Sequence, residues 1–206
     1  MKKVFIGCGV LVVLAIIVLI FVVVAGGSYN RLNTLNQSVN KQWADVQNQY
    51  QRRSDLIPNL VSTVSGAANF EKSTLTEIAD ARASVGRVTI DAKNAPTEAA
   101  QLAEYQKAQG QLTSALSHLM SITENYPDLK SNTNFRDLQA QLEGTENRIT
   151  VERGNFNAAV QAFNTAVTSF PAALYAGFFH FKEKPYFAAA AGSEKAPAVQ
   201  FDMNKK

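Results

Sequence analysis

The sequence predicts an all-α protein: an N-terminal transmembrane helix, an up-and-down four-helix bundle with long antiparallel helices, and an aromatic C-terminal tail. Three observations predict this organisation. The chain begins with a long uncharged run, its middle part repeats apolar residues at helical spacing, and its last part gathers aromatic side chains. We expect three regions: a flank and anchor at residues 1–27, a bundle domain at 28–170 and a tail at 171–206.

The anchor is predicted from residues 4–25, which carry no charge and include 17 Val, Leu, Ile or Phe residues among 22. About 20 apolar residues span the hydrocarbon core of a bilayer, and this run favours insertion by roughly 5–10 kcal/mol. A cleaved signal peptide ending near Val23-Val24-Ala25 is the alternative, but its apolar region is ordinarily only about 7–15 residues long. We therefore expect an uncleaved, single-pass anchor.

The direction of the anchor is predicted from the charges that flank it. Lys2, Lys3 and the amino terminus precede the span, and Arg31 and Lys41 are the nearest positive residues after it. Because the more positive flank stays in the cytoplasm, we expect the soluble domain to lie on the extracytoplasmic side.

Two helices are predicted in the first half of the domain, after a break at Gly26-Gly27-Ser28. In the first of them apolar residues recur at intervals of three and four: Leu32, Leu35, Val39, Trp43, Val46 and Tyr50. Proline lacks the amide hydrogen that a helix interior requires. We therefore expect a helix boundary or a sharp kink at Pro58, and a second helix from Leu60 to about Gly86.

Two more helices are predicted in the second half. The third carries apolar residues from Leu102 to Ile122, and the fourth keeps a nearly strict heptad spacing from Phe135 to Phe170. Similar helix lengths and short connections predict the up-and-down bundle. Glu152 interrupts the apolar seam of the fourth helix, and a buried charge needs a partner. We expect an inter-helix ion pair with Arg82 or Arg53 there, in preference to a ligand site.

Candidate interaction residues lie at the expected junction near Pro58. Arg52, Arg53 and Asp55 could bind lipid phosphates or an acidic partner, because arginine forms bidentate contacts with such groups. The alternative is that the three residues cap and brace the turn, and we favour this structural interpretation.

The tail supplies a second set of candidates. Residues 170–187 hold seven of the 19 aromatic residues of the chain, and the interaction candidates among them are Phe178, Phe179, Phe181, Tyr186 and Phe187. The run at 178–181 cannot bury every ring on one face of one element. The rings could fold back on the bundle, form a subunit interface or lie at the membrane surface. Val199 and Phe201 alternate like a short strand.

Several classes of function find no support in the sequence. The net charge of +3, two units of which come from Lys2 and Lys3, is too small to predict nucleic-acid binding. The single cysteine, Cys8, cannot form an internal disulfide, and neither His118 nor His180 belongs to a Glu-x-x-His pair. Since no zinc, phosphate-loop or nucleophile-elbow motif is present either, we expect no catalytic residue, no cofactor and no metal.

Several segments together resemble the LemA family. They are QYQRRSDLIPNLV at residues 49–61, EIADARA at 77–83, YPDLK at 126–130, QLEGTENRI at 141–149, and the segments at 170–171 and 196–201. The resemblance covers about residues 28–202. It implies a single-pass bacterial membrane protein with a helical domain and no established biochemical activity. It also implies a cytoplasmic domain, opposite to the direction given by the charges, so both orientations stay open.

The sequence as a whole predicts a membrane-anchored, non-enzymatic scaffolding protein of the bacterial inner membrane. We expect it to form a homo-oligomer and to contact membrane lipid and an unidentified protein partner. A regulatory adaptor for a membrane enzyme or sensor is the second hypothesis, and an uncharacterised hydrolase is the third.

Overall fold

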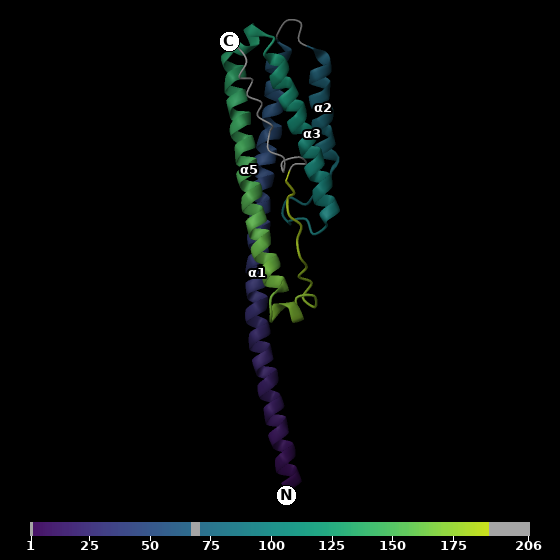
Figure 1. The fold of residues 1–206 in the computed structure, drawn as a ribbon, viewed down its shortest axis with the longest axis vertical. Helices are drawn as coiled ribbons and strands as arrows, with labels where there is room; N and C mark the ends of the chain where they lie inside the picture. Colours follow the sequence, from purple (N-terminus) through teal and green to yellow (C-terminus); the bar gives the residue numbers. More distant parts are fainter. Residues whose placement is uncertain (1, 67–70, 190–206) are drawn as a thin grey trace, which may run out of the picture.

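The computed structural model describes residues 2–66 and 71–189, and its regular structure there is entirely helical (Figure 1). The elements are α1 (Lys2–Ser65), α2 (Lys72–Arg87), α3 (Ala99–Thr123), α4 (Pro127–Ser131), α5 (Thr133–Thr168) and the short 3-10 helix η1 (Ala172–Leu174). No strand occurs in these described ranges, so the predicted all-α class is confirmed. The strand proposed at Val199 and Phe201 lies outside the described residues.

Helix α1 is a single element of 64 residues that contains both the anchor and the first helix of the domain. At 1.5 Å per residue it is about 95 Å long. The break predicted at Gly26-Gly27-Ser28 is therefore wrong, and the boundary expected at residue 27 lies inside a helix. Two glycines cost about 1 kcal/mol each in helix propensity, which the apolar run before them and the packed face from Leu32 onward offset.

The predicted boundary at Pro58 is also wrong, because α1 continues past this residue to Ser65. Ile57, Leu60 and Val64 are all buried on one face of this last stretch. Their packing outweighs the loss of one backbone hydrogen bond at the exposed proline. As a result, the helix predicted from Leu60 to Gly86 is divided: its first part ends α1, and the rest is α2.

The other two predicted helices are present. Helix α3 follows the expected range, and α5 begins where the side chain of Asn132 accepts a hydrogen bond from the Phe135 amide, 3.2 Å away. This is a typical N-terminal cap. The expected stop at Tyr126-Pro127-Asp128 instead opens the five-residue α4, with Pro127 in its first turn.

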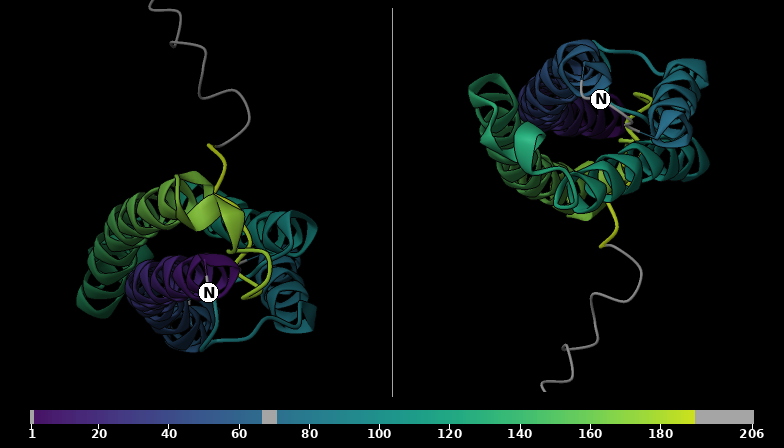
Figure 2. Two further views of the ribbon diagram at one scale, coloured as in Figure 1. Left: turned by 90° about the horizontal axis from the view of Figure 1, so that it is seen from below. Right: turned by 90° about the horizontal axis from the view of Figure 1, so that it is seen from above.

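The helices form two antiparallel pairs, which the views along and across the long axis show (Figures 1 and 2). Helix α1 runs beside α5, and the shorter α2 runs beside α3. With 16 and 25 residues, α2 and α3 are much shorter than the 36-residue α5. The similar lengths on which the bundle prediction depended are thus not observed, and an up-and-down four-helix bundle is not confirmed.

The core consists of two clusters stacked along the long axis. The cluster nearer the N-terminus joins α1, α3 and α5 to the C-terminal segment, residues 169–189, and includes Trp43, Tyr105, Phe156 and Phe187. The other cluster joins α1 to α2, α3, α4 and α5. The C-terminal segment therefore packs between helices at a level of the domain where α2 is absent (Figure 1).

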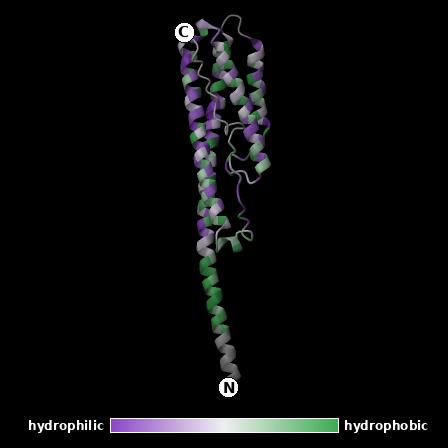
Figure 3. Ribbon diagram, in the orientation of Figure 1, coloured by the Kyte–Doolittle hydropathy of each residue, from purple (hydrophilic) through white to green (hydrophobic). Residues whose placement is uncertain are grey.

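The N-terminal part of α1 projects beyond the domain as an isolated apolar stretch (Figure 3). The large apolar side chains from Val13 to Val24 are all exposed. Among the described residues, α1 is the single helix that is long and apolar enough to span a membrane.

Candidate functional site

The structure separates the three candidates near Pro58. Arg53 is buried, with 1% of its surface exposed, whereas Arg52 and Asp55 are exposed on α1. Because α1 does not end there, these residues cap no turn, and Asp55 accepts a hydrogen bond from Gln51 one turn earlier, at 2.7 Å. The turn that these residues were expected to cap and brace is therefore absent.

Arg53 is the centre of a buried polar network that joins three helices. Its guanidinium forms an ion pair with Glu146 of α5 and hydrogen bonds with the side chain of Gln109 and, at 2.8 Å, with Thr113, both on α3. It also lies over the Tyr50 ring, 5.3 Å from the ring centre. Because the charge is buried and paired, Arg53 ties α1 to α3 and α5 and is not accessible to lipid or to an acidic partner.

The ion pair expected at Glu152 is absent. Glu152 is half-buried and accepts a hydrogen bond from Asn155 on its own helix, while Arg82 donates to Ser54 across 3.4 Å. Arg53 forms its inter-helix ion pair instead with Glu146, six residues earlier along α5. The heptad spacing predicted that Glu152 lies on the apolar face of the fourth helix. In the structure, α5 is rotated so that Glu152 lies at the edge of that face.

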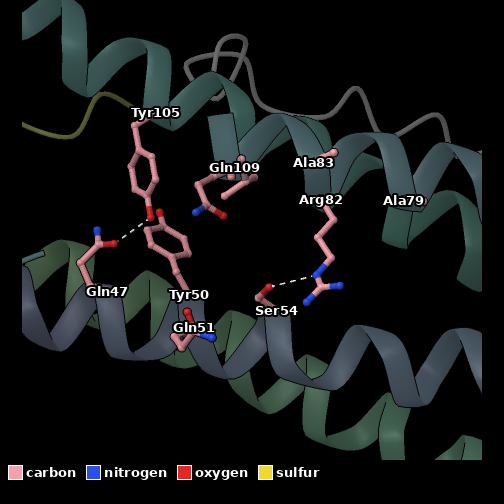
Figure 4. A pocket seen from close by; sticks show the side chains of 11 residues that line it. Gln47, Tyr50, Gln51, Ser54, Ala79, Arg82, Ala83, Tyr105 and Gln109 are labelled. Atoms are coloured by element: carbon pink, nitrogen blue, oxygen red, sulfur yellow. Dashed lines mark hydrogen bonds between the residues drawn. The ribbon is translucent and has the colours of Figure 1, made fainter. Parts of the chain in front are cut away.

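An open groove lies next to this network, between α1 and the α2–α3 pair (Figure 4). Its volume is about 570 Å³. The side chains that line it carry amide, hydroxyl and guanidinium groups, with Gln47, Tyr50 and Tyr105 at one end and Ser54 and Arg82 at the other. The Tyr105 hydroxyl donates to Gln47 at 2.9 Å. The groove offers hydrogen-bonding groups and contains no carboxylate, imidazole or thiol among its lining residues.

The two tyrosines of the groove are held neutral. Burial raises the pKa of Tyr50 to about 12, an effect that the nearby Arg153 and Arg53 only partly oppose. Burial also raises the pKa of Tyr105. Both hydroxyls therefore act as hydrogen-bonding groups at neutral pH rather than as bases.

The C-terminal segment is held in place by side-chain amides. Asn164 of α5 donates to the Lys184 carbonyl (2.9 Å) and accepts from its amide (2.8 Å). Asn157 makes the same pair of bonds with Phe187, at 3.0 and 2.9 Å, and Gln106 of α3 makes it with Ala188. Seven residues of helix and three of extended chain both span about 10 Å. The two asparagines therefore match Lys184 and Phe187 in spacing.

The aromatic candidates of the tail divide into buried and exposed residues. Phe187 is 5% exposed and packs against Trp43 and Phe156, with ring centres 6.0 and 5.3 Å apart. Phe179 and Phe181 are half-buried against Tyr29, and Tyr186 and Phe178 are exposed. Phe187 is thus a core residue in this structure. Of the three locations left open for these rings, folding back on the domain accounts for Phe179, Phe181 and Phe187.

The histidines lie far apart on the surface. His118 of α3 contacts Glu77 of α2 at 2.9 Å, and both side chains are exposed. His180 lies in the C-terminal segment, where its backbone has a positive φ of 62°. Within the part of the chain that the structure describes, no three His, Cys, Asp or Glu residues form a group that could hold a metal ion.

These features define a class: all-helical proteins whose domain continues from a single N-terminal apolar helix long enough to span a bilayer. Within that class the chain belongs to the LemA family, whose model matches residues 42–201. The resemblance found in the sequence is thereby confirmed.

Two kinds of curated relatives are similar to the chain. The magnetosome protein MamQ of Magnetospirillum gryphiswaldense is 26% identical over 77% of this chain, and the magnetosome protein MamQ 2 of Paramagnetospirillum magneticum is 25% identical over the same share. The protein LemA of Metamycoplasma hominis is 25% identical over 73% of this chain. In each case the match spans 64% of the length of the relative. The names of the family and of these relatives denote no enzyme.

Proposed function

We propose that the protein is a non-enzymatic, membrane-anchored scaffold that self-associates and organises membrane or partner proteins. One observation carries the proposal: α1, the longest helix of the domain core, also carries the apolar stretch that is long enough to span a membrane. A domain built on its own anchor is held at a fixed distance from the bilayer, which suits a structural role better than a domain on a flexible linker. The relatives' names, which denote magnetosome and LemA proteins, are compatible with this role.

The exposed tail aromatic Tyr186 supports self-association. Its ring is 47% exposed although its neighbours Phe187 and Lys184 are buried, and tyrosine is enriched at protein interfaces. Tyr186 is therefore the first residue to change in a test of assembly.

The mass of the full-length protein in mild detergent, measured by light scattering, tests this proposal. We expect a uniform particle of several subunits, visible by negative-stain microscopy, and a smaller particle for Tyr186→Ser. Val151→Ser, which removes an exposed apolar side chain of α5, serves as the matched control. A monomer at all concentrations, also in cross-linking before extraction, would contradict self-association.

A regulatory adaptor is the second candidate, and the groove between α1 and the α2–α3 pair favours it. Its hydrogen-bonding lining is suited to the polar side chains of a partner protein. A single heterologous partner recovered in stoichiometric amount, together with a monomeric mass, would select this function over the scaffold.

We further propose that the domain lies on the extracytoplasmic, periplasmic side of the inner membrane. Lys2, Lys3 and the amino terminus outweigh Arg31 and Lys41 as flanking positive charges.

A further inference from the structure

An exposed apolar patch lies at the end of the domain from which the anchor projects. It consists of Phe170, Leu174 and Phe178, which are 82%, 73% and 80% exposed, and we refer to it as the basal patch. These residues belong to the segment that follows α5 and contains η1, and Figure 1 shows that this segment forms the lower end of the domain beside α1. Three large apolar side chains that are this exposed within one short segment indicate a contact surface.

The basal patch is held by a structured turn. Helix η1 begins at Ala172, directly after Pro171, and Tyr175 and Ala176 just after it are buried in the core. The amides of Ala176 and Phe181 donate to the carbonyls of Ala172 and Ala176, at 2.8 and 2.9 Å. The side chains of the basal patch are thus held at the surface by a turn whose neighbouring residues, Tyr175 and Ala176, pack in the core.

Contacts with α1 fix the patch close to the end of the apolar span. Tyr29 lies four residues after Ala25, the last residue of the uncharged run, which corresponds to about 6 Å along the helix. Its ring centre is 5.1 Å from that of Phe179, which in turn lies 5.3 Å from that of Phe178. A groove of about 470 Å³ joins Phe170 to Ser28 and Arg31 on α1.

This distance identifies the surface that the patch meets. The headgroup layer on each side of a bilayer is about 5–7 Å thick. If α1 spans the membrane, a patch about one helical turn beyond the span therefore lies at headgroup level, where no space remains for a second protein beneath it. Exposed Arg31 and Lys182 at the same end supply positive charge for lipid phosphates, with Glu183 as the nearby acidic residue.

We propose that Phe170, Leu174 and Phe178 enter the headgroup and upper acyl region of the bilayer that α1 spans, as a second membrane contact of the domain. Aromatic side chains favour this interface, and apolar residues presented beside basic ones are typical of surfaces that lie in it. The proposal rests on α1 spanning the membrane, and it is independent of self-association.

Spin-label accessibility in lipid vesicles tests the proposal on the full-length chain. Cys8→Ala removes the native thiol, and Phe178→Cys or Leu174→Cys then carries a nitroxide. Both native side chains are exposed, so neither change opens the core, and the helix content by circular dichroism checks the fold. Collision rates are measured with oxygen, which concentrates in the bilayer, and with a water-soluble nickel chelate.

Two control sites bracket the expected result. Position 18, labelled in Val18→Cys, lies in the apolar span. Position 151, labelled in Val151→Cys, lies on α5 far from that span, and both native side chains are about 60% exposed. We expect the oxygen-to-nickel ratio at positions 174 and 178 to lie between the ratios at positions 18 and 151, and to be several-fold above that at position 151.

Two other outcomes would overturn the proposal. A ratio equal to that at position 151 would place the patch in water. Low collision rates with both reagents would show that another protein surface, such as a second copy, covers it. A monomeric mass by light scattering would contradict the scaffold proposal and leave these ratios unchanged, so the two failures are distinguishable.

Discussion

Arg52 and Arg53 are adjacent in sequence but occupy opposite environments, because α1 turns one side chain to solvent and the other into the core. The guanidinium of Arg53 satisfies partners on α3 and α5 at once. Removing one partner of a buried ion pair is strongly destabilising, because the charge of the other partner is then left unpaired. Arg53 is therefore a structural residue, and replacing it should lower the free energy of unfolding.

We expect Arg53→Met to lower the free energy of unfolding by about 2–4 kcal/mol, because it leaves Glu146 and the buried Gln109 side chain without their donor. Arg52→Met is the matched control and should change it by less than about 0.5 kcal/mol. Urea unfolding in detergent, followed by circular dichroism, measures both. Equal effects of the two variants would contradict the role assigned to the network.

The stability of the protein should fall in strongly alkaline solution in part because of Tyr50. Its folded-state pKa is about 12, and in an unfolded chain a tyrosine ionises near pH 10. Between these pH values the folded state binds more protons, so the free energy of unfolding decreases as the pH rises. The contribution is fully present below pH 10 and amounts to about 2–3 kcal/mol.

Tyr50→Phe should therefore show a shallower decline in unfolding free energy between pH 10 and pH 12 than the unmodified protein. Urea midpoints at several pH values provide the comparison. The stabilising contribution of Tyr105 declines in the same direction. Because Tyr105 remains in both proteins, the difference between the two curves isolates the contribution of Tyr50. Parallel curves would show that Tyr50 ionises normally in the folded state.

At the residue scale, the sequence indicated Arg53 but not its role. The motif near Pro58 drew attention to it, whereas its partner Glu146 lies 93 residues away. Only the rotation of α1 and α5 about their axes decides which carboxylate faces the arginine. An error of part of a turn in the heptad assignment was enough to select Glu152 instead.

At the scale of elements, the C-terminal segment replaces a helix with an extended chain. The carbonyl and amide groups that a helix would pair internally are here paired by Asn157, Asn164 and Gln106. Each amide side chain donates and accepts, so one residue satisfies both backbone groups of its partner. This arrangement pairs the backbone groups of Lys184, Phe187 and Ala188 while the segment lies between helices.

We expect the double variant Asn157→Ala/Asn164→Ala to release this segment. Chymotrypsin should then cleave after Phe187, which is buried in the unmodified protein, roughly tenfold faster or more, since four hydrogen bonds, each worth about 1 kcal/mol, are lost. Asn155→Ala, which removes an exposed asparagine of the same helix, is the control. Unchanged cleavage in the double variant would mean that ring packing of Phe187 alone holds the segment.

The continuity of α1 leads to a second prediction at this scale. In a helix, alanine is favoured over glycine by about 1 kcal/mol, and a Cβ atom at Gly26 or Gly27 would meet no atom within 4 Å beyond the neighbouring backbone of its own helix. Gly26→Ala/Gly27→Ala should therefore keep or raise the thermal midpoint and preserve the mass in detergent. Gly26→Pro is the disruptive control. A lower midpoint for the alanine variant would indicate a turn at this position, as the sequence alone suggested.

Helix periodicity identified the elements well and their ends poorly. The ranges of α3 and α5 followed from apolar spacing because each is bounded by clear stop signals. The glycine pair and Pro58 are equally clear signals locally, yet packing of Leu32 on one side and of Leu60 and Val64 on the other continues α1 through both. The asparagines that hold the tail resemble surface residues in the sequence, so nothing marked them in advance.

At the scale of the whole molecule, the side of the membrane on which the domain lies can be measured directly. Ser117 of α3 is exposed and far from the anchor. In cells that carry Cys8→Ala/Ser117→Cys, a membrane-impermeant maleimide should label the protein once the outer envelope is opened, with no lysis of the inner membrane. Labelling that requires lysis would place the domain in the cytoplasm, and a cytoplasmic thiol protein controls for leakage.

A helix that runs without interruption from the bilayer to the far end of the domain acts as a lever. About 40 residues of α1 follow the apolar run, so its arm is roughly 60 Å long. Membrane helices adjust their tilt when the hydrocarbon thickness changes, and a change of about 10° moves the end of such an arm sideways by roughly 10 Å. For an α1 that spans the bilayer, small mechanical adjustments of the lipid are thereby amplified at the tip formed by α4 and the end of α1.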